Sequence, residues 1–236
     1  MRLGIISALA EEQHGLIDAM ESPIKASHGM RDYTVGRLWN TDVVCVLSRI
    51  GKVAAAMTAS ILVEKFDVTH IVFTGVAGSG DLGVRVGDIV VADSLVQHDM
   101  DASPLFSRFE IPLTGQSHIA SDRELTRRLT AAARDFLQNE PGSPQIHRGL
   151  IASGDQFINK RSQLAAIKDA LPELLAVEME GAAVAQVCFE LGIPFGVIRT
   201  ISDNANEDAA IDFMHFVQTV ASRYAYGIVK NFCVPH

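Results

Sequence analysis

The sequence contains few cysteines and no excess of positive charge. Its three cysteines, Cys45, Cys188 and Cys233, are far apart and have apolar neighbours, unlike the paired pattern of a disulfide-bonded protein. We expect free buried thiols in a reducing compartment. The 236 residues include 20 Lys and Arg against 28 Asp and Glu, a net charge of -8. Because nucleic-acid backbones and anionic membranes favour basic proteins, we predict neither as a partner and expect a small neutral or cationic ligand.

Long apolar runs are also missing. The first residues, MRLGIISALAEEQ, contain one basic residue and an apolar run too short for a signal peptide, and no later run reaches the length of a membrane span. We therefore predict a cytoplasmic protein. No internal repeat, low-complexity tract or interdomain linker interrupts the chain, and 48% of the residues are hydrophobic. This length and composition predict one domain over residues 1–236 with a substantial core.

Short apolar segments rich in β-formers alternate with longer helical patterns. Most of these short segments lack strict polar alternation, which is typical of strands buried on both faces. The predicted strands are residues 2–8, 42–48, 70–76, 88–94, 148–154, 174–180 and 195–202. The predicted helices are residues 51–66, 121–137, 160–171, 181–191 and 211–232. Together they predict an α/β sandwich around a mixed, largely parallel central sheet flanked by helices.

Two helix ends carry capping signals. Ser121 with Glu124 three residues later is a capping-box pattern at the start of the second predicted helix. Gly192 followed by Pro194 ends the fourth.

Residues 99–118, DMDASPLFSRFEIPLTGQSH, have weak periodicity and read as a long loop. Loops of this length in compact domains are usually lids, binding loops or partner contacts. Leu105, Phe106, Phe109 and Ile111 are apolar residues that a solvated loop does not need, so we expect them to be covered.

Two motifs suggest functions that their surroundings do not support. Gly78, Gly80 and Gly83 have dinucleotide-binding spacing, but a strand pattern follows where that fingerprint requires a helix, so Gly80 and Gly83 read as turn residues. Gly75 and Gly78 lie nearer the strand end, where a missing side chain lets a ligand approach the backbone. Residues 98–101, HDMD, have no second histidine cluster or cysteine pair at ligand spacing, so we predict no metal and no cofactor.

Acidic residues follow three of the predicted strands: Glu11 and Glu12, Glu178 and Glu180, and Asp203. Ligands of parallel α/β sheets bind at the carboxyl ends of strands, so these acids could converge on one site. The alternative for any one of them is a helix N-terminal acid that interacts with the helix dipole. Converging carboxylates suit glycosidic chemistry, in which one acid protonates the leaving group and another orients water.

Eight motifs spread over nearly the whole chain carry a specific resemblance. They are GIISALAEE, SRIGKVAAA, TGVAG, VGDIVVAD, QHDMD, GLIASGDQFI, AVEMEGAAVA and RTISDNA. In this order they resemble the bacterial 5'-methylthioadenosine/S-adenosylhomocysteine nucleosidases. The resemblance implies a nucleoside-phosphorylase-like fold, a homodimer, and hydrolysis of the adenine N-glycosidic bond to release adenine and a 5-substituted ribose.

The resemblance also implies roles for individual residues. Glu12 in ALAEE is similar to the residue that positions or activates the attacking water. Asp203 in RTISD resembles the acid that protonates adenine N7, with Ser202 orienting it. Glu180 in VEMEG resembles the ribose-hydroxyl ligand, with Arg199 nearby. Burial of Asp203 would raise its pKa above the ~3.9 of a free Asp, so that it could hold a proton near neutral pH.

Further pocket residues follow from the same motifs. Met179 is expected to pack against the sugar, and Phe157 and Ile158 in GDQFI resemble the purine-stacking residue and the backbone partner of the adenine edge. Phe213 resembles a pocket wall. Glu178 is open to two interpretations, support of the ribose site or a helix N-terminal acid.

The sequence departs from the commonest family pattern at two places near the sugar and its 5' substituent. Val76 in TGVAG stands where many members have Ser, and residues 101–112, DASPLFSRFEIP, differ from the usual aromatic, glycine-rich loop. The preferred substrate among methylthioadenosine, S-adenosylhomocysteine, 5'-deoxyadenosine and aminofutalosine therefore stays open.

Three further expectations concern the wider function. Apolar residues in loop 99–113 suggest that it packs at a two-fold interface and closes the partner's pocket. The nearest alternative activity is that of a purine nucleoside phosphorylase, which would need cationic residues for phosphate. A nucleoside-binding sensor without catalysis would have lost Glu12 or Asp203, and both are present.

Overall fold

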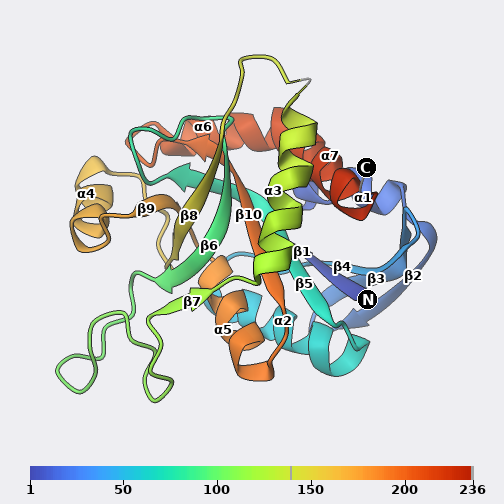
Figure 1. Cartoon of the computed structure of the whole chain (residues 1–236), viewed down its shortest axis with the longest axis horizontal. Helices are drawn as coiled ribbons and strands as arrows, with labels where there is room; N and C mark the ends of the chain where they lie inside the picture. Colours follow the sequence, from blue (N-terminus) through green and yellow to red (C-terminus); the bar gives the residue numbers. More distant parts are fainter. Residues whose placement is uncertain (139, 235–236) are drawn as a thin grey trace.

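The structure is a computed structural model that describes residues 1–138 and 140–234, and it contains one mixed sheet of ten strands with helices on both sides (Figure 1). The strands are β1 (Arg2–Ser7), β2 (Glu21–His28), β3 (Arg31–Leu38), β4 (Thr41–Leu47), β5 (His70–Ser79), β6 (Ile89–Gln97), β7 (His118–Ala120), β8 (Ile146–Ser153), β9 (Leu174–Glu178) and β10 (Phe195–Asp203). They lie in the order β10-β6-β8-β9-β5-β1-β4-β3-β2, and β7 pairs with β6. Because β10 also pairs with β5, strands β5, β9, β8, β6 and β10 close into a ring.

Seven α-helices occur in the described residues: α1 (His14–Asp18), α2 (Lys52–Phe66), α3 (Arg123–Leu137), α4 (Arg161–Ala170), α5 (Gly181–Leu191), α6 (Ala209–Phe216) and α7 (Ser222–Cys233). A 3₁₀ turn, Ala10–Glu12, precedes α1, and a π-helical turn, Val217–Ala221, joins α6 to α7. None of the helices in residues 1–138 and 140–234 has the length and apolar character needed to cross a membrane.

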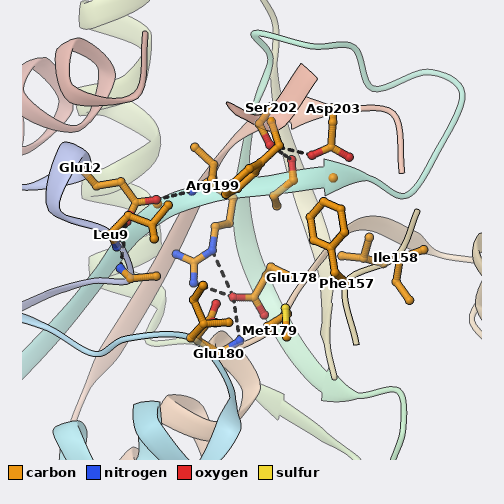
Figure 2. Close-up of a pocket in the computed structure, with 18 of the residues that line it drawn as sticks. Leu9, Glu12, Phe157, Ile158, Glu178, Met179, Glu180, Arg199, Ser202 and Asp203 are labelled. Carbon is orange, nitrogen blue, oxygen red and sulfur yellow. Dashed lines mark hydrogen bonds and ion pairs between the residues drawn. The ribbon is translucent and has the colours of Figure 1, made fainter. Parts of the chain in front are cut away.

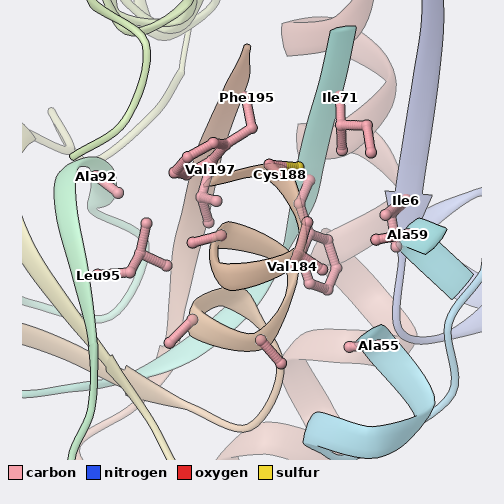
Figure 3. Packing of buried hydrophobic residues seen from close by; sticks show 14 of the residues in the cluster. Ile6, Ala55, Ala59, Ile71, Ala92, Leu95, Val184, Cys188, Phe195 and Val197 are labelled. Carbon is pink, nitrogen blue, oxygen red and sulfur yellow. The ribbon is translucent and has the colours of Figure 1, made fainter. Parts of the chain in front are cut away.

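The core has two main parts, one on each face of the sheet. Helices α2 and α5 pack on one face, where Ala55 and Ala59 of α2 and Val184 and Cys188 of α5 lie against strand residues such as Val197 (Figure 3). Helices α1, α3 and α7 pack on the other face. All nine residues of β10, FGVIRTISD, are buried, which agrees with the continuous apolar pattern of a two-sided strand.

The fold agrees with the sequence prediction for all seven predicted strands and all five predicted helices, with small shifts at their ends. The helix predicted over residues 211–232 is present as α6, the π-helical turn and α7. Gly192 ends α5 in the left-handed conformation, as its pattern predicts.

The predicted capping box at Ser121 is wrong. The backbone N–H of Ser121 donates to Asp93 of β6, which keeps this residue in the strand-like segment. Asp122 is the N-cap, and its carboxylate accepts from Leu125 N at 2.8 Å.

Parallel pairing brings three strand ends to one edge of the sheet. Strand β1 pairs in parallel with β5, and β5 pairs in parallel with β10 as far as the pair Gly78 and Asp203. Strand β9 runs antiparallel to the end of β5, with Val177 opposite Gly78. The ends of β1, β9 and β10 and residues 75–78 of β5 therefore lie close together.

The long loop after β6 is only partly covered within this chain. Phe109 is buried beside Ala152 and Ile158, and Ile111 joins the core on the α5 side. Leu105 is 83% exposed and Leu113 is 91% exposed. The expectation that the apolar residues are covered therefore holds for Phe109 and Ile111 and in part for Phe106, whereas Leu105 is exposed.

Candidate active site

A cavity of about 370 Å³ opens where the ends of β1, β5, β9 and β10 meet (Figure 2). All twelve residues that the sequence singled out for the site line it: Glu12, Val76, Gly78, Phe157, Ile158, Glu178, Met179, Glu180, Arg199, Ser202, Asp203 and Phe213. Glu11 is exposed and does not line the cavity, so the predicted convergence of strand-end acids includes four of the five.

Glu12 is a buried carboxylate held by backbone N–H groups. Its Oε2 accepts from Ala8 N at 2.8 Å and Leu9 N at 3.0 Å, and its Oε1 accepts from Val76 N at 3.2 Å. The 3₁₀ turn after β1 therefore directs the side chain across the end of β5. Burial raises the pKa of Glu12 above its ordinary value, and the N–H donors and the charge of Arg199 oppose that rise.

Glu178 and Arg199 form a fully buried ion pair. Arg199 Nη2 and Nε donate to Glu178 Oε2 at 2.6 and 3.2 Å, and Nη1 donates to the carbonyls of Phe73 and Ile198. Glu178 also accepts from Ser153 Oγ and from Gly181 N at the start of α5. Its oxygens are thus bonded to protein groups, and the bond from Gly181 N fits the interpretation of Glu178 as a helix N-terminal acid, while support of a ribose site stays a prediction.

Glu180 is the acid at this edge with the fewest protein partners. Its Oε1 accepts from Gly51 N at 2.8 Å, and no second donor to this carboxylate occurs in the described part of the chain. The side chain is 6% exposed. Burial, and next the charge of Glu178, raise the pKa of Glu180 to about 8. A carboxyl group that titrates near neutral pH can exchange hydrogen bonds with ligand hydroxyls.

Asp203 ends β10 and is 2% exposed. Its Oδ1 accepts from Ala205 N at 2.8 Å, and its Oδ2 accepts from Ser202 Oγ at 2.8 Å. Burial raises the pKa of Asp203, and these two hydrogen bonds oppose the rise. Asp203 is therefore a carboxyl group disposed to hold a proton.

Glycines of β5 make room for both acids. A Cβ at Gly75 would lie 3.1 Å from Glu12 Oε1, and a Cβ at Gly78 would lie 2.9 Å from Asp203 Oδ1. Both distances are shorter than ordinary van der Waals contacts. Both glycines also line the cavity, so the absence of a side chain at these positions accommodates the two acids, and the approach of a ligand to the backbone there stays a prediction.

Aromatic side chains form the wall on the Asp203 side of the cavity. Phe157 meets Phe213 of α6 edge-to-face, with ring centroids 5.8 Å apart. Phe157 is 40% exposed, and Ile158 beside it is buried. Figure 2 shows Glu12 on one side of the labelled group and Asp203 with Phe157 on the other. A flat aromatic ligand could stack here within reach of Asp203.

Sequence reasoning missed several lining residues, among them Leu9, Ile50, Phe73 and Gln156. Leu9 and Ile50 follow the predicted strands 2–8 and 42–48 by one and two residues, so the strand-end rule could have found them. Phe73 lies inside β5, and the centroid of its ring lies 4.0 Å from the guanidinium carbon of Arg199. No sequence pattern distinguishes Phe73 from an ordinary core residue.

The charges of the cavity determine which ligands it can accept. Among the described residues that line it, Arg199 is the single basic one, and four of its five N–H donors are bonded to Glu178 and to two main-chain carbonyls. The other charged lining groups are carboxyl groups. In the described residues, no group of three or more His, Cys, Asp or Glu side chains is arranged to hold a metal ion.

The fold and this acid-lined cavity define an enzyme of the nucleoside phosphorylase type, and the family model described as "Phosphorylase superfamily" matches residues 2–233. A 5'-methylthioadenosine/S-adenosylhomocysteine nucleosidase of Shewanella frigidimarina is 36% identical over 217 residues, which are 92% of each chain. One from an Exiguobacterium species is 34% identical over 222 residues, 94% of this chain and 93% of the relative. The chain belongs to the 5'-methylthioadenosine/S-adenosylhomocysteine nucleosidase family.

Solved structures of the same family have the same fold. The Neisseria meningitidis nucleosidase in complex with methylthio-immucillin-A has a TM-score of 0.90 and 35% identity, and the match covers 98% of this chain and 99% of that one. The Colwellia psychrerythraea nucleosidase in complex with adenine has a TM-score of 0.90 and 34% identity, covering 99% and 95%. The predicted family and fold class are therefore confirmed.

Proposed function

We propose that this protein, as a single nucleosidase domain over residues 1–236, hydrolyses the N-glycosidic bond of 5'-methylthioadenosine and S-adenosylhomocysteine. The products are adenine and the 5-substituted ribose. Two buried acids carry the proposal: Asp203, whose raised pKa lets it hold a proton, and Glu12 across the same cavity. Arg199, the one basic residue among the described residues that line this cavity, is already paired with Glu178. The relatives named for this activity support the same substrates.

Asp203 acts as the general acid. Adenine leaves poorly as an anion, so the reaction needs a proton on the base as the C1'–N9 bond breaks and its electron pair moves to the ring. Asp203 gives its proton to N7 of the adenine, and Ser202 holds the carboxyl group in orientation through its 2.8 Å hydrogen bond. A positioned general acid is typically worth ~10² to 10⁴ in rate.

Glu12 acts on the attacking water. Three backbone N–H groups fix its carboxylate, so little motion is needed when the water oxygen bonds to C1'. Glu12 accepts the proton that the water releases. The raised pKa of Glu12 makes it a better base than a solvated carboxylate.

The remaining lining residues bind the substrate. Glu180 binds the ribose hydroxyls, and Met179 packs against the sugar. Phe157 stacks on the adenine, and the Ile158 backbone meets its edge. Phe213 closes the wall behind Phe157.

The end of β5 and the buried ion pair frame the sugar. Val76 and Gly78 border it from β5, and Arg199 keeps Glu178 in place beneath it.

Hydrolysis is favoured over phosphorolysis by the same charges. A phosphate ion beside C1' would lie among Glu12, Glu178 and Glu180, and Glu178 with two main-chain carbonyls already accepts from four of the five N–H donors of Arg199. Adenine release measured with and without phosphate tests this. Equal rates, with free 5-methylthioribose as the product, are expected, whereas a phosphate requirement and a ribose 1-phosphate product would refute hydrolysis.

We also propose a cytoplasmic homodimer in which loop 99–113 closes the 5' end of the partner's pocket. The exposed Leu105 supports this, because an apolar side chain of that size gains from being covered. Sedimentation at micromolar concentration, run beside the activity assay, should give a dimer. A fully active monomer would exclude the arrangement.

A further inference from the structure

Lys52, Asp99 and Asp155 form a polar cluster outside the cavity that joins three separate segments. Lys52 is the first residue of α2, Asp99 follows β6, and Asp155 lies in the loop after β8. Lys52 Nζ donates to Asp99 Oδ1 at 2.7 Å, and Asp155 N donates to Asp99 Oδ2 at 2.9 Å. Lys52 N donates to Asp155 Oδ1 at 2.8 Å. Each member therefore contacts the other two.

The cluster adjoins both halves of the proposed substrate site. On one side, Gly51 precedes Lys52 and donates its N–H to Glu180. On the other side, Asp155 immediately precedes Gln156, Phe157 and Ile158, which line the cavity. The cluster thus links the Glu180 carboxylate, through Gly51, to the loop that carries the aromatic wall, in addition to the bond from Gly154 N to the carbonyl of Glu178.

The start of α2 depends on this link. Gly51, its N-cap, has φ of 98° and no side chain to cap the first turn. Asp155 supplies the missing acceptor and a negative charge at the positive end of the helix. A Cβ at Gly51 would lie 3.2 Å from Asp155 Oδ1, so the two segments are packed closely.

We propose that Lys52, Asp99 and Asp155 are positioning residues for hydrolysis, which hold Gly51 against Glu180 and fix the loop 156–158 relative to the ribose site. None of them lines the cavity, so they act through Gly51 and Phe157. The inference rests on the proposed function, since it assigns the cluster to that reaction. Misplacement of binding groups by about 1 Å can cost as much as 10²-fold in rate.

Substitutions at Asp155 separate the hydrogen bond from the charge. Asp155→Asn keeps an oxygen that can accept from Lys52 N, whereas Asp155→Ala removes it. We expect Asp155→Ala to lose roughly tenfold in kcat/KM for methylthioadenosine, mostly through KM, and Asp155→Asn to recover most of that loss. Asp99→Ala, which removes the acceptor for Lys52 Nζ and Asp155 N, should behave like Asp155→Ala.

The matched control is Asp81→Ala. Asp81 likewise accepts from a lysine, Lys168 Nζ at 2.6 Å, and from a backbone N–H, Gly83 N at 2.8 Å, but it is not among the lining residues. It should change thermal stability by a similar amount and leave kcat/KM unchanged.

The pH profile gives a readout that general destabilisation would not move. The Gly51 N–H lowers the pKa of Glu180, which also faces Glu178, Arg199 and Glu12. Loss of that hydrogen bond should move the acidic limb of kcat/KM to higher pH by roughly one unit. Removal of the negative charge of Asp155 alone would lower the pKa of Glu180 and move the acidic limb of the kcat/KM profile to lower pH. A shift of this limb to higher pH therefore indicates that the hydrogen bond from Gly51 to Glu180 is lost.

The outcomes distinguish the two proposals. A wild-type enzyme that releases no adenine from methylthioadenosine refutes the proposed function and the role of the cluster with it. An active wild type, together with Asp155→Ala and Asp99→Ala variants that keep wild-type KM and pH profile, refutes the cluster alone. Equal losses in Asp155→Ala and Asp81→Ala would also overturn the inference.

Discussion

Replacing Asp203 with asparagine tests whether this residue gives up a proton or only makes hydrogen bonds. The asparagine oxygen can keep the bond from Ala205 N, and its amide can donate to Ser202 Oγ in place of the bond that Oδ2 accepts. The Ser202 hydroxyl then donates to the carbonyl of Ala77, which is already 3.2 Å away. Because no buried donor or acceptor is lost, the free energy of unfolding should change by about 1 kcal/mol or less.

Catalysis should respond very differently, because an amide cannot hand over a proton. Asp203→Asn should lose ~10² or more in kcat, with a much smaller change in substrate affinity. Adenine release measured beside thermal unfolding separates the two effects. A variant that keeps a third of wild-type turnover, with a normal melting temperature, would refute the assignment of Asp203 as the acid.

The same variant has a predicted dependence of stability on pH. The pKa of Asp203 is raised in the folded protein, so its contribution to stability is present below the ordinary Asp pKa of 3.8 and is lost as pH rises through the folded value. Asp203→Asn does not titrate. Its melting temperature should therefore rise relative to that of the wild type as pH increases above 3.8.

Three other substitutions test the neighbouring groups. Glu12→Gln should abolish hydrolysis and leave binding of a nucleoside analogue nearly unchanged, as calorimetry can check; near-normal turnover would remove Glu12 from the mechanism. Glu178→Gln leaves the buried Arg199 without its counter-charge. The free energy of unfolding, measured by chemical denaturation, should fall by about 3–5 kcal/mol, and a loss below about 1 kcal/mol would contradict the buried ion pair. The Glu180→Gln variant should become more stable relative to the wild type as pH rises from 4.5 to 8, because the wild-type protein loses stability between the ordinary and the folded pKa of Glu180. A difference in melting temperature that does not change over this pH range would contradict the raised pKa.

The inner strands and the site could be predicted from the sequence because their signals are local. Strand β10 begins with the apolar run FGVI and ends in an acid, Asp203, which stands out against that run. The strand-end rule then groups Glu12, Glu180 and Asp203 without knowledge of the topology. The particular role of each acid came only from the family resemblance.

The hairpin of β2 and β3 and the cluster around Lys52 could not be predicted in this way. Strand β2, ESPIKASH, is almost entirely exposed at the edge of the sheet and contains a proline, so it lacks both apolar runs and alternation. The cluster joins residues 47 and 103 positions apart in the chain, and each looks like an ordinary surface charge. Only the three-dimensional arrangement shows that they meet.

The glycines of β5 limit how this enzyme could escape an inhibitor. A drug-resistant variant usually arises when a new side chain blocks the drug but spares the substrate. At Gly75 and Gly78 any new side chain would first collide with the carboxylates of Glu12 or Asp203, at 3.1 and 2.9 Å. An inhibitor that takes its contacts from the main chain of this strand would therefore face a surface that a single substitution at either glycine could change only by displacing the carboxylate of Glu12 or Asp203.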